Sequence, residues 1–238
     1  MLSQVTFGRR IAAEALGSAF LLAAIVGSGI MGERLAGGNA AVTLLANALS
    51  TGAALVVLIL VYGPVSGAHF NPVVTVAAAS YREIPWRDVP SYLAAQVVGA
   101  FVGVAAANSM FGAPPFFASH HAREGIPQLL SEAIATFGLL ATIWGCARHR
   151  PSSVPFAVAA YITAAYWFTA STSFANPAVT VARAATDTFS GIRPIDVPGF
   201  IGAQIVGAAA ATVFFHWLIP HPAGSRSLPA SSRQEGAL

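Results

Sequence analysis

The chain has no lysine, a single cysteine and very few charges of either sign. Of its 238 residues only 9% are charged, against about a quarter in a typical soluble domain. So few charges cannot cover a water-facing surface, and the lone Cys146 excludes an intramolecular disulfide. Apolar residues make up 55% of the chain and the mean hydropathy is +0.67. The composition therefore predicts that lipid surrounds most of the chain.

All 12 basic residues are arginine, and the isoelectric point is near 9.5. A basic protein can be a nucleic-acid binder, but these arginines are scattered between apolar stretches and form no basic face. We interpret them as loop anchors and orientation signals of a membrane protein, and expect no nucleic-acid partner.

Six apolar stretches are candidates to cross a bilayer, which takes about 20 residues. We predict spans at residues 11–31, 41–62, 90–111, 128–147, 154–170 and 197–219. Two shorter apolar pieces begin at Asn71 and Asn176 and are too short to cross. Arg9 and Arg10 precede the first stretch as in a signal peptide, but that stretch is too long for one and recurs later in the chain.

The arginines predict the orientation in the membrane. With both termini inside, eight arginines fall in cytoplasmic segments and three, Arg34, Arg123 and Arg193, fall in outer loops. Positive loops stay inside, so we expect both termini in the cytoplasm and an integral protein of a bacterial inner membrane. Residues 221–238 are rich in Ser, Pro and Ala and are predicted to form a disordered cytoplasmic tail beyond a membrane domain of residues 1–220.

The two halves of the chain repeat one another. Glu14 matches Glu132 in its local pattern, residues 71–77 (NPVVTVA) match 176–182 (NPAVTVA), and residues 95–100 (AQVVGA) match 203–208 (AQIVGA). Each repeat, about 8–111 and 127–220, contains three spans, and an odd number inverts the second repeat relative to the first. We predict an all-α membrane protein with six transmembrane helices and two re-entrant half-helices in an inverted 3+3 repeat.

Each short piece begins with Asn-Pro. Asn is a favoured N-cap and Pro suits the first helical position, so Asn71 with Pro72 and Asn176 with Pro177 should each start a half-helix. A helix that begins inside a membrane must line a water-filled cavity or be buried in protein. Inversion brings both N-termini to the midplane, where their positive dipole ends oppose cations and protons. We expect the Asn amides to bind neutral solutes, and the segments before them to be extended.

This pattern resembles the aquaporin, or major intrinsic protein, family. The residues that carry the resemblance are 66–75 (SGAHFNPVVT), 174–179 (FANPAV) and the paired Glu14 and Glu132. The resemblance implies a pore in each subunit of a homotetramer and passive conduction of small neutral solutes. Val73 stands where the family usually has the Ala that the second motif keeps as Ala178, and we expect conduction to survive this difference.

The chain departs from the family directly after the second motif. Family members usually place Arg there, at the narrowest constriction, whereas this chain has Val179. Counting along the family pattern places the other constriction positions at Thr51, Ala164 and Ser173, with Tyr166 or Trp167 as alternatives to Ala164.

This set of side chains predicts a wide, uncharged opening for glycerol-like polyols, arsenite and related metalloid hydroxides, and water. This chain lacks the Arg and carries Asn-Pro-Ala-Val-Thr at residues 176–180. In both respects it resembles bacterial family members that are linked to the passage of arsenite and methylated arsenicals. A water-selective pore is the alternative.

Four further residues are open to two interpretations. Arg183 lies one helical turn beyond Val179, and it either points into the outer mouth or stabilises the outer loop. His69 either lines the cytoplasmic part of the pore or is a satisfied buried side chain. Glu14 and Glu132 would act in a proton relay or, as their matched positions favour, accept hydrogen bonds from the irregular backbone before each half-helix.

Two other classes of function compete with a channel. An ion-coupled secondary transporter also has inverted repeats and broken helices, but its coupling site would have to be Glu14 or Glu132. An enzyme is not expected, because the sequence has no nucleophile–base pair, metal-ligand cluster or phosphate loop, and for the same reason we expect neither metal nor cofactor.

Overall fold

The computed structural model describes residues 5–219, and every regular element in that part of the chain is a helix. Short 3-10 turns, Trp86–Asp88, Pro151–Ser153 and Pro194–Asp196, lead into three of the long helices. The predicted tail, 221–238, lies outside the described residues. The α-helices are α1 (Phe7–Leu35), α2 (Ala40–Ser66), α3 (Pro72–Ser80), α4 (Val89–Met110), α5 (Ile126–His149), α6 (Val154–Phe168), α7 (Pro177–Arg183) and α8 (Val197–Leu218).

The predicted spans and the observed helices agree in number and order, but not in length. Helices α1, α2, α4, α5 and α8 are each long and apolar enough to cross a membrane. The remaining predicted span is α6, whose 15 residues give about 22 Å at 1.5 Å per residue, less than the ~30 Å hydrocarbon core. It stops at Phe168 because Thr169 adopts an extended conformation, from which the chain turns back towards the second half-helix.

Local sequence explains where most helices begin. Proline occupies the first turn of every helix from α3 to α8, where its missing N–H costs no hydrogen bond. The N-terminus of α2 is capped by Asn39, whose side chain accepts hydrogen bonds from the N–H groups of Ala41 and Val42. The end of α2 is set by Gly67, which takes a left-handed conformation (φ 94°) that favours glycine.

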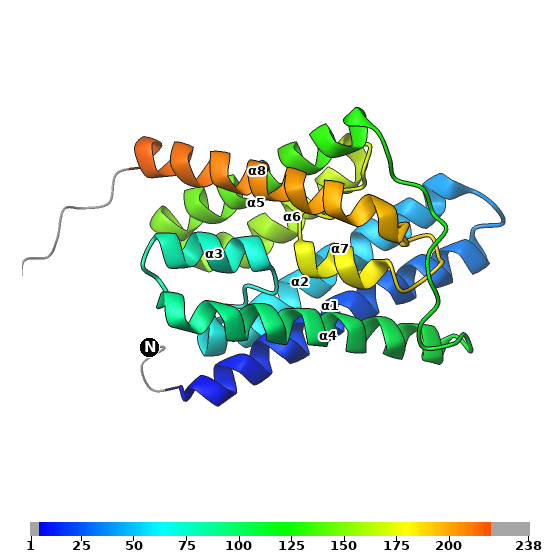
Figure 1. The fold of residues 1–238 in the computed structure, drawn as a ribbon, viewed down its shortest axis with the longest axis horizontal. Helices are drawn as coiled ribbons and strands as arrows, with labels where there is room; N and C mark the ends of the chain where they lie inside the picture. Colours follow the sequence, from blue (N-terminus) through cyan, green and yellow to red (C-terminus); the bar gives the residue numbers. More distant parts are fainter. Residues whose placement is uncertain (1–4, 220–238) are drawn as a thin grey trace, which may run out of the picture.

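The half-helices lie between the two repeats and point in opposite directions. In Figure 1, α3 and α7 lie end to end between α4 and α8, with their N-termini towards the middle of the molecule. Each contacts helices of both repeats, since α3 and α7 both pack against α4 and α8. The chain therefore has the predicted architecture: an all-α membrane fold of six membrane helices and two half-helices in an inverted repeat.

Glycines allow the closest helix contacts, at equivalent places in the two repeats. A Cβ on Gly99 of α4 would lie 2.1 Å from the carbonyl oxygen of Ala15 in α1. A Cβ on Gly207 of α8 would lie 2.2 Å from the carbonyl oxygen of Ala133 in α5. Any larger residue would push these helices apart, so Gly99 and Gly207 let each repeat close on itself.

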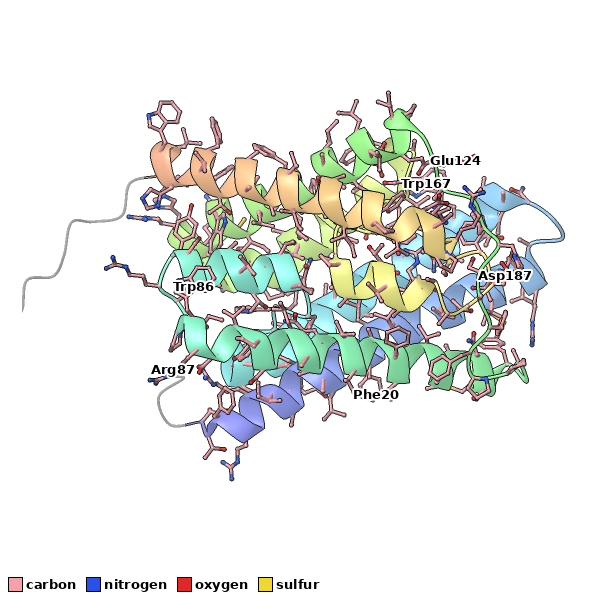
Figure 2. All side chains as sticks on the ribbon, in the orientation of Figure 1. Phe20, Trp86, Arg87, Glu124, Trp167 and Asp187 are labelled. Carbon is pink, nitrogen blue, oxygen red and sulfur yellow. The ribbon has the colours of Figure 1, made fainter. Side chains whose placement is uncertain are left out.

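The outer surface is apolar between two polar ends. Phe20, in the middle of α1, is 59% exposed and points away from the bundle (Figure 2). Trp86 and Arg87 lie at one end of the molecule, and Glu124 and Asp187 lie at the other (Figure 2). This band of exposed apolar side chains is what a helix bundle presents to lipid, and the chain is an integral membrane protein.

Candidate functional site

The two half-helices meet through a reciprocal pair of hydrogen bonds. The Nδ2 atom of Asn71 donates to the carbonyl oxygen of Ala175 at 2.8 Å, and Nδ2 of Asn176 donates to the carbonyl oxygen of Phe70 at 2.7 Å. The side-chain oxygens cap their own helices: Oδ1 of Asn71 accepts from Val73 N at 3.1 Å. Each amide therefore joins the two repeats with one hydrogen and retains a second one for a solute.

Oδ1 of Asn176 accepts hydrogen bonds from the N–H groups of Ala178 and Val179, at 3.0 and 3.3 Å. The motif residues Pro72 and Pro177 occupy the first helical turn beside these caps. Both helix N-termini thus open at the same place in the interior, close to the centre of the bundle.

The backbone before each Asn is not simply extended, and that prediction is wrong. Ala68 and Phe70 have φ of 51° and 49°, and their repeat equivalents Ser173 and Ala175 have φ of 52° and 49°. Such left-handed conformations in non-glycine residues are strained, at a cost of roughly 1–3 kcal/mol each. The matching strain in both repeats shows that the surrounding structure imposes this conformation.

Glu14 is one source of that constraint. Its carboxylate accepts four hydrogen bonds, from Ser66 Oγ at 2.6 Å, His69 N at 3.0 Å, Phe70 N at 2.8 Å and Gln96 Nε2 at 2.8 Å. These four donors are shared between both carboxylate oxygens, two to each. These contacts fit the structural role, in which the glutamate accepts hydrogen bonds from the irregular backbone before the half-helix, rather than a proton relay.

Glu132 has the equivalent contacts in the second repeat. It accepts from Phe174 N and Ala175 N, both at 2.9 Å, and from Gln204 Nε2 at 2.6 Å. Gln204 Nε2 also donates to Thr180 Oγ1 at 2.8 Å, as Gln96 does to Thr75 in the first repeat. The resulting network ties each half-helix to the preceding irregular backbone.

A cavity of about 270 Å³ runs past both asparagines. Its wall repeats across the two halves, since equivalent apolar residues from α1 and α5, α2 and α6, and α3 and α7 line it. These pairs are Leu21 with Leu139, Ile25 with Ile143, Leu55 with Ile162, and Val74 with Val179. The wall is mostly apolar, with a few polar groups along its length. A cavity at the interface of two inverted repeats, beside two interrupted helices, is where a binding or conduction site is expected.

Three of the four predicted constriction residues line this cavity, and the fourth does not. Thr51, Ser173 and Val179 lie on the wall, each at most 3% exposed. Ala164 lies on the exposed face of α6, so its placement at the constriction is wrong. Tyr166, one of the two alternatives to Ala164, lines the cavity instead, because two residues along a helix turn the side chain by about 200° to the opposite face.

Tyr166 is larger and more polar than Ala164, which the count along the family pattern placed at the constriction. Its hydroxyl lies 3.2 Å from Oγ1 of Thr51, within hydrogen-bonding distance. Ser173 contributes a hydroxyl that is buried and, among the described residues, has no hydrogen-bond partner. Val179, in the first turn of α7, completes the set with an apolar wall.

Two buried arginines lie at the α7 end of the cavity, close to one phenyl ring. The Cζ atom of Arg183 lies 3.4 Å from the centroid of Phe174, and that of Arg123 lies 4.9 Å from it. Arg183 is 1% exposed, lines the cavity, and donates from Nε to the carbonyl oxygen of Ser190. Burial of two cations is assisted here by the face of the ring.

Arg123 acts as a clamp on the loops around this end. Its guanidinium donates to the carbonyl oxygens of Gly191 at 2.8 Å, Ser171 at 3.0 Å and Phe189 at 3.2 Å. The sequence indicated only a loop arginine, because its contacts come from segments far along the chain. Burial and the charges of Arg123 and Arg183 lower the pKa of the loop residue His121, against the opposing effect of Asp187.

The opposite, α3, end of the cavity contains His69. Its Nδ1 lies 3.1 Å from Thr75 Oγ1, which donates its own hydrogen to the carbonyl oxygen of Asn71. Nδ1 is therefore assigned as the donor, which leaves Nε2 as the acceptor of the neutral ring. His69 is partly exposed and lines the cavity. Glu83, whose pKa is raised by burial, and Trp144 line the same end.

Comparison with known proteins agrees with this geometry. The model of the family described as major intrinsic protein matches residues 1–154. The aquaglyceroporin AqpS of Rhizobium meliloti (strain 1021) is 53% identical over 211 residues, covering 89% of this chain and 90% of that protein. The aquaporin NIP1-3 of Oryza sativa subsp. japonica is 37% identical over 145 residues, 60% of this chain and 50% of that protein.

Among solved structures, the aquaglyceroporin from Plasmodium falciparum has a similar fold. The TM-score is 0.70 at 21% identity, and the match covers 90% of this chain and 98% of that one. The chain belongs to the major intrinsic protein family, and it is a membrane channel for small solutes rather than an enzyme.

Proposed function

We propose that this channel passively conducts glycerol-like polyols, arsenite and related metalloid hydroxides, and water, and that it excludes ions and protons. The observation that carries the proposal is that Thr51, Tyr166, Ser173 and Val179 all line the cavity, and we assign these four side chains to its aperture. Three hydroxyls and one isopropyl group face a neutral solute there, and no guanidinium follows the second Asn-Pro-Ala motif directly. Polyols and trihydroxides have both the hydroxyl groups and the apolar edges that such a wall accommodates.

Ion exclusion rests on the centre of the channel. The N-termini of α3 and α7 open towards the cavity, and each carries roughly half a positive charge. Where the two dipoles meet, a cation would find no carboxylate to replace its water, because Glu14 and Glu132 are engaged by backbone and side-chain donors and Glu83 lines the α3 end of the cavity. A neutral solute instead meets the unused amide hydrogens of Asn71 and Asn176.

We further propose that the protein is a homotetramer in a bacterial inner membrane, with both termini in the cytoplasm. The start of α1 and the end of α8 lie at the same end of the molecule (Figure 1), as this orientation requires. The α3 end with His69 would then face the cytoplasm, and the α7 end with Arg183 would face outward.

A water-selective pore is the second candidate, and Tyr166 is the observation that favours it. A phenol in place of the methyl of Ala164 narrows the aperture, and its hydrogen bond to Thr51 holds the ring across it. An ion-coupled transporter lacks comparable support, because Glu14 and Glu132 accept hydrogen bonds from four and three donors respectively, and neither lines the cavity.

The experiment is a flux assay in proteoliposomes with water, glycerol, urea and arsenite, each against empty vesicles. We expect glycerol and arsenite to equilibrate faster than in empty vesicles, without saturation and with the same rate when a proton or sodium gradient is imposed. If water alone is accelerated, the pore is water-selective and the proposal is wrong. Dependence of the flux on an ion gradient would instead indicate a transporter.

A further inference from the structure

Arg183 has hydrogen-bond donors that the protein does not use. It lies at the end of α7, one turn beyond Val179, and lines the cavity although it is only 1% exposed. Among the described residues, its guanidinium donates to Ser190 alone, through Nε. Nη1 and Nη2 make no hydrogen bond within that part of the chain, although an arginine buried for structural reasons alone would normally satisfy them.

The geometry of the guanidinium determines which edge is available. One face lies on the ring of Phe174, at 3.4 Å from Cζ to the centroid, and the Nε edge is directed to Ser190. The ring itself is held by an edge contact with Phe200 at 5.2 Å and by Arg123 at 4.9 Å. With its face and its Nε edge occupied, the guanidinium has the edge with Nη1 and Nη2 left for the lumen.

Ser173 adds a second unused polar group to the same wall. Its Oγ is buried without a partner among the described residues, and the residue is 3% exposed. Ser173 directly precedes Phe174, over whose ring Arg183 lies, and both Ser173 and Arg183 line the cavity. Two unsatisfied buried polar side chains in one lumen indicate a missing polar partner.

The repeat shows that this feature belongs to one end of the channel. The residue equivalent to Arg183 on α3 is Ala78, and the residue equivalent to Ser173 is Ala68, and both also line the cavity. The α3 end thus carries methyl groups where the α7 end carries a guanidinium and a hydroxyl. A structural role shared by the two repeats therefore does not explain why Arg183 and Ser173 are polar.

We infer that Arg183 and Ser173 form a solute-binding subsite for neutral molecules with two adjacent hydroxyl oxygens, such as a vicinal diol or a metalloid hydroxide. Nη1 and Nη2 are spaced to donate to two such oxygens at once, and Ser173 Oγ exchanges a hydrogen bond with one of the hydroxyls. The subsite replaces water that the solute loses on entering the apolar aperture. The inference rests on the proposed function, because it requires that polyols or metalloid hydroxides pass.

The subsite also explains how the pore can lack the usual arginine yet keep a cation at its mouth. The guanidinium of Arg183 lies one helical turn from Val179, so it does not occupy the aperture itself. Its positive charge still repels cations that approach this end of the cavity. Arg123 contributes a second positive charge close by, but its donors are bound to loop carbonyls. Arg183 is therefore the one of the two whose donors remain for the solute.

The test compares the variants Arg183→Met and Arg183→Lys with the unchanged protein in proteoliposomes, as the ratio of glycerol permeability to water permeability. We expect Arg183→Met to lower this ratio about tenfold, equivalent to about 1.4 kcal/mol at the barrier. Arg183→Lys keeps the charge but loses the planar pair of donors, so it should give an intermediate ratio. Ser173→Ala should lower the ratio in the same direction by a smaller factor.

Arg34→Met is the matched control. Arg34 also lies over a phenyl ring, that of Phe111 at 4.9 Å, and also donates to one backbone carbonyl, but it does not line the cavity. Its removal should leave the ratio unchanged. Using the ratio cancels differences in the amount of inserted protein. If Arg183→Met does not fold, the ratio measured for Arg183→Lys tests the inference.

An unchanged ratio in the arginine variants would overturn the inference, as would a parallel loss of water and glycerol flux. Either result would make Arg183 a purely structural residue of the loop that contains Ser190. A failure of the proposed function would look different, since the unchanged protein would then show no glycerol flux above that of empty vesicles.

Discussion

Tyr166 and Thr51 join α6 to α2 across the channel wall, with 3.2 Å between the phenol oxygen and Oγ1. The contact connects the two repeats directly at the aperture, in addition to the asparagine pair at the centre. It puts an aromatic ring where counting along the sequence placed a methyl group. In the proposed aperture this contact holds the ring of Tyr166 in place, and the next two substitutions test the size of that aperture.

Tyr166→Ala should widen the channel. Removing the ring and its hydrogen bond to Thr51 leaves the three smaller side chains of the aperture, so permeability to glycerol and larger polyols should rise several-fold relative to water. Vesicle swelling measures both permeabilities. The matched control is Ala164→Val, on the exposed face of the same helix, which should have no effect on selectivity. Equal changes in the two variants would contradict the assignment of Tyr166 to the aperture.

Val179→Arg should restrict the channel to water. The substitution introduces the residue that family members usually have after Asn-Pro-Ala, and a guanidinium fills space that the isopropyl group leaves open. We expect glycerol and arsenite permeability to fall at least tenfold, which corresponds to about 1.4 kcal/mol, while water permeability persists. Val179→Leu is the control for size without charge and should reduce glycerol flux less. The proposal for the aperture would be contradicted if Val179→Arg conducted glycerol as well as the unchanged protein does.

Glu132→Gln should weaken the fold without changing any proton dependence of flux. The amide presents hydrogens to Phe174 N, Ala175 N or Gln204 Nε2, which are themselves donors. Hydrogen bonds to charged groups are worth about 1.5–3 kcal/mol each, so the melting temperature in detergent should fall by about 5 °C or more. Glu124→Gln, at an exposed ion pair with Arg193, should change it little. A proton-coupled flux that Glu132→Gln abolishes would instead favour a transporter.

Gly207→Ala should destabilise the second repeat. The added methyl would lie 2.2 Å from the carbonyl oxygen of Ala133, so α8 and α5 must separate at a cost of about 1–3 kcal/mol. Gly202→Ala on the same helix is the control, because among residues 5–219 no atom beyond its chain neighbours and the adjacent backbone of α8 lies within 4 Å of its Cβ position. Thermal unfolding in detergent compares the two variants. If they are equally stable, the close contact of α8 with α5 does not limit stability.

Much of the architecture follows from local features of the chain. Apolar length predicts the membrane helices, the Asn-Pro pairs predict where α3 and α7 begin, and the recurrence of Glu14 as Glu132 predicts the inverted repeat. These features act over a few residues or through an exact recurrence, so no knowledge of distant contacts is needed to recognise them. The structural role of the two glutamates could be inferred for the same reason.

Other features depended on contacts that a sequence does not show. Ala164 and Tyr166 differ by two residues, and only the packing of α6 against α2 decides which of them faces the lumen. The left-handed backbone at Phe70 and Ala175 exists because Glu14 and Glu132 accept the N–H groups of those residues. No local pattern predicts a strain that distant partners impose.

By itself, then, the sequence determined a lipid-embedded inverted repeat with two helix N-termini at its centre, because hydrophobic length, capping chemistry and internal recurrence are local properties. Only the tertiary structure decided what lines the aperture and which cation remains available there. Arg123 and Arg183 are both arginines near the same ring, yet loop carbonyls occupy the donors of the first and leave Nη1 and Nη2 of the second unused. That difference arises from contacts between distant segments, and they form only when the two repeats pack together.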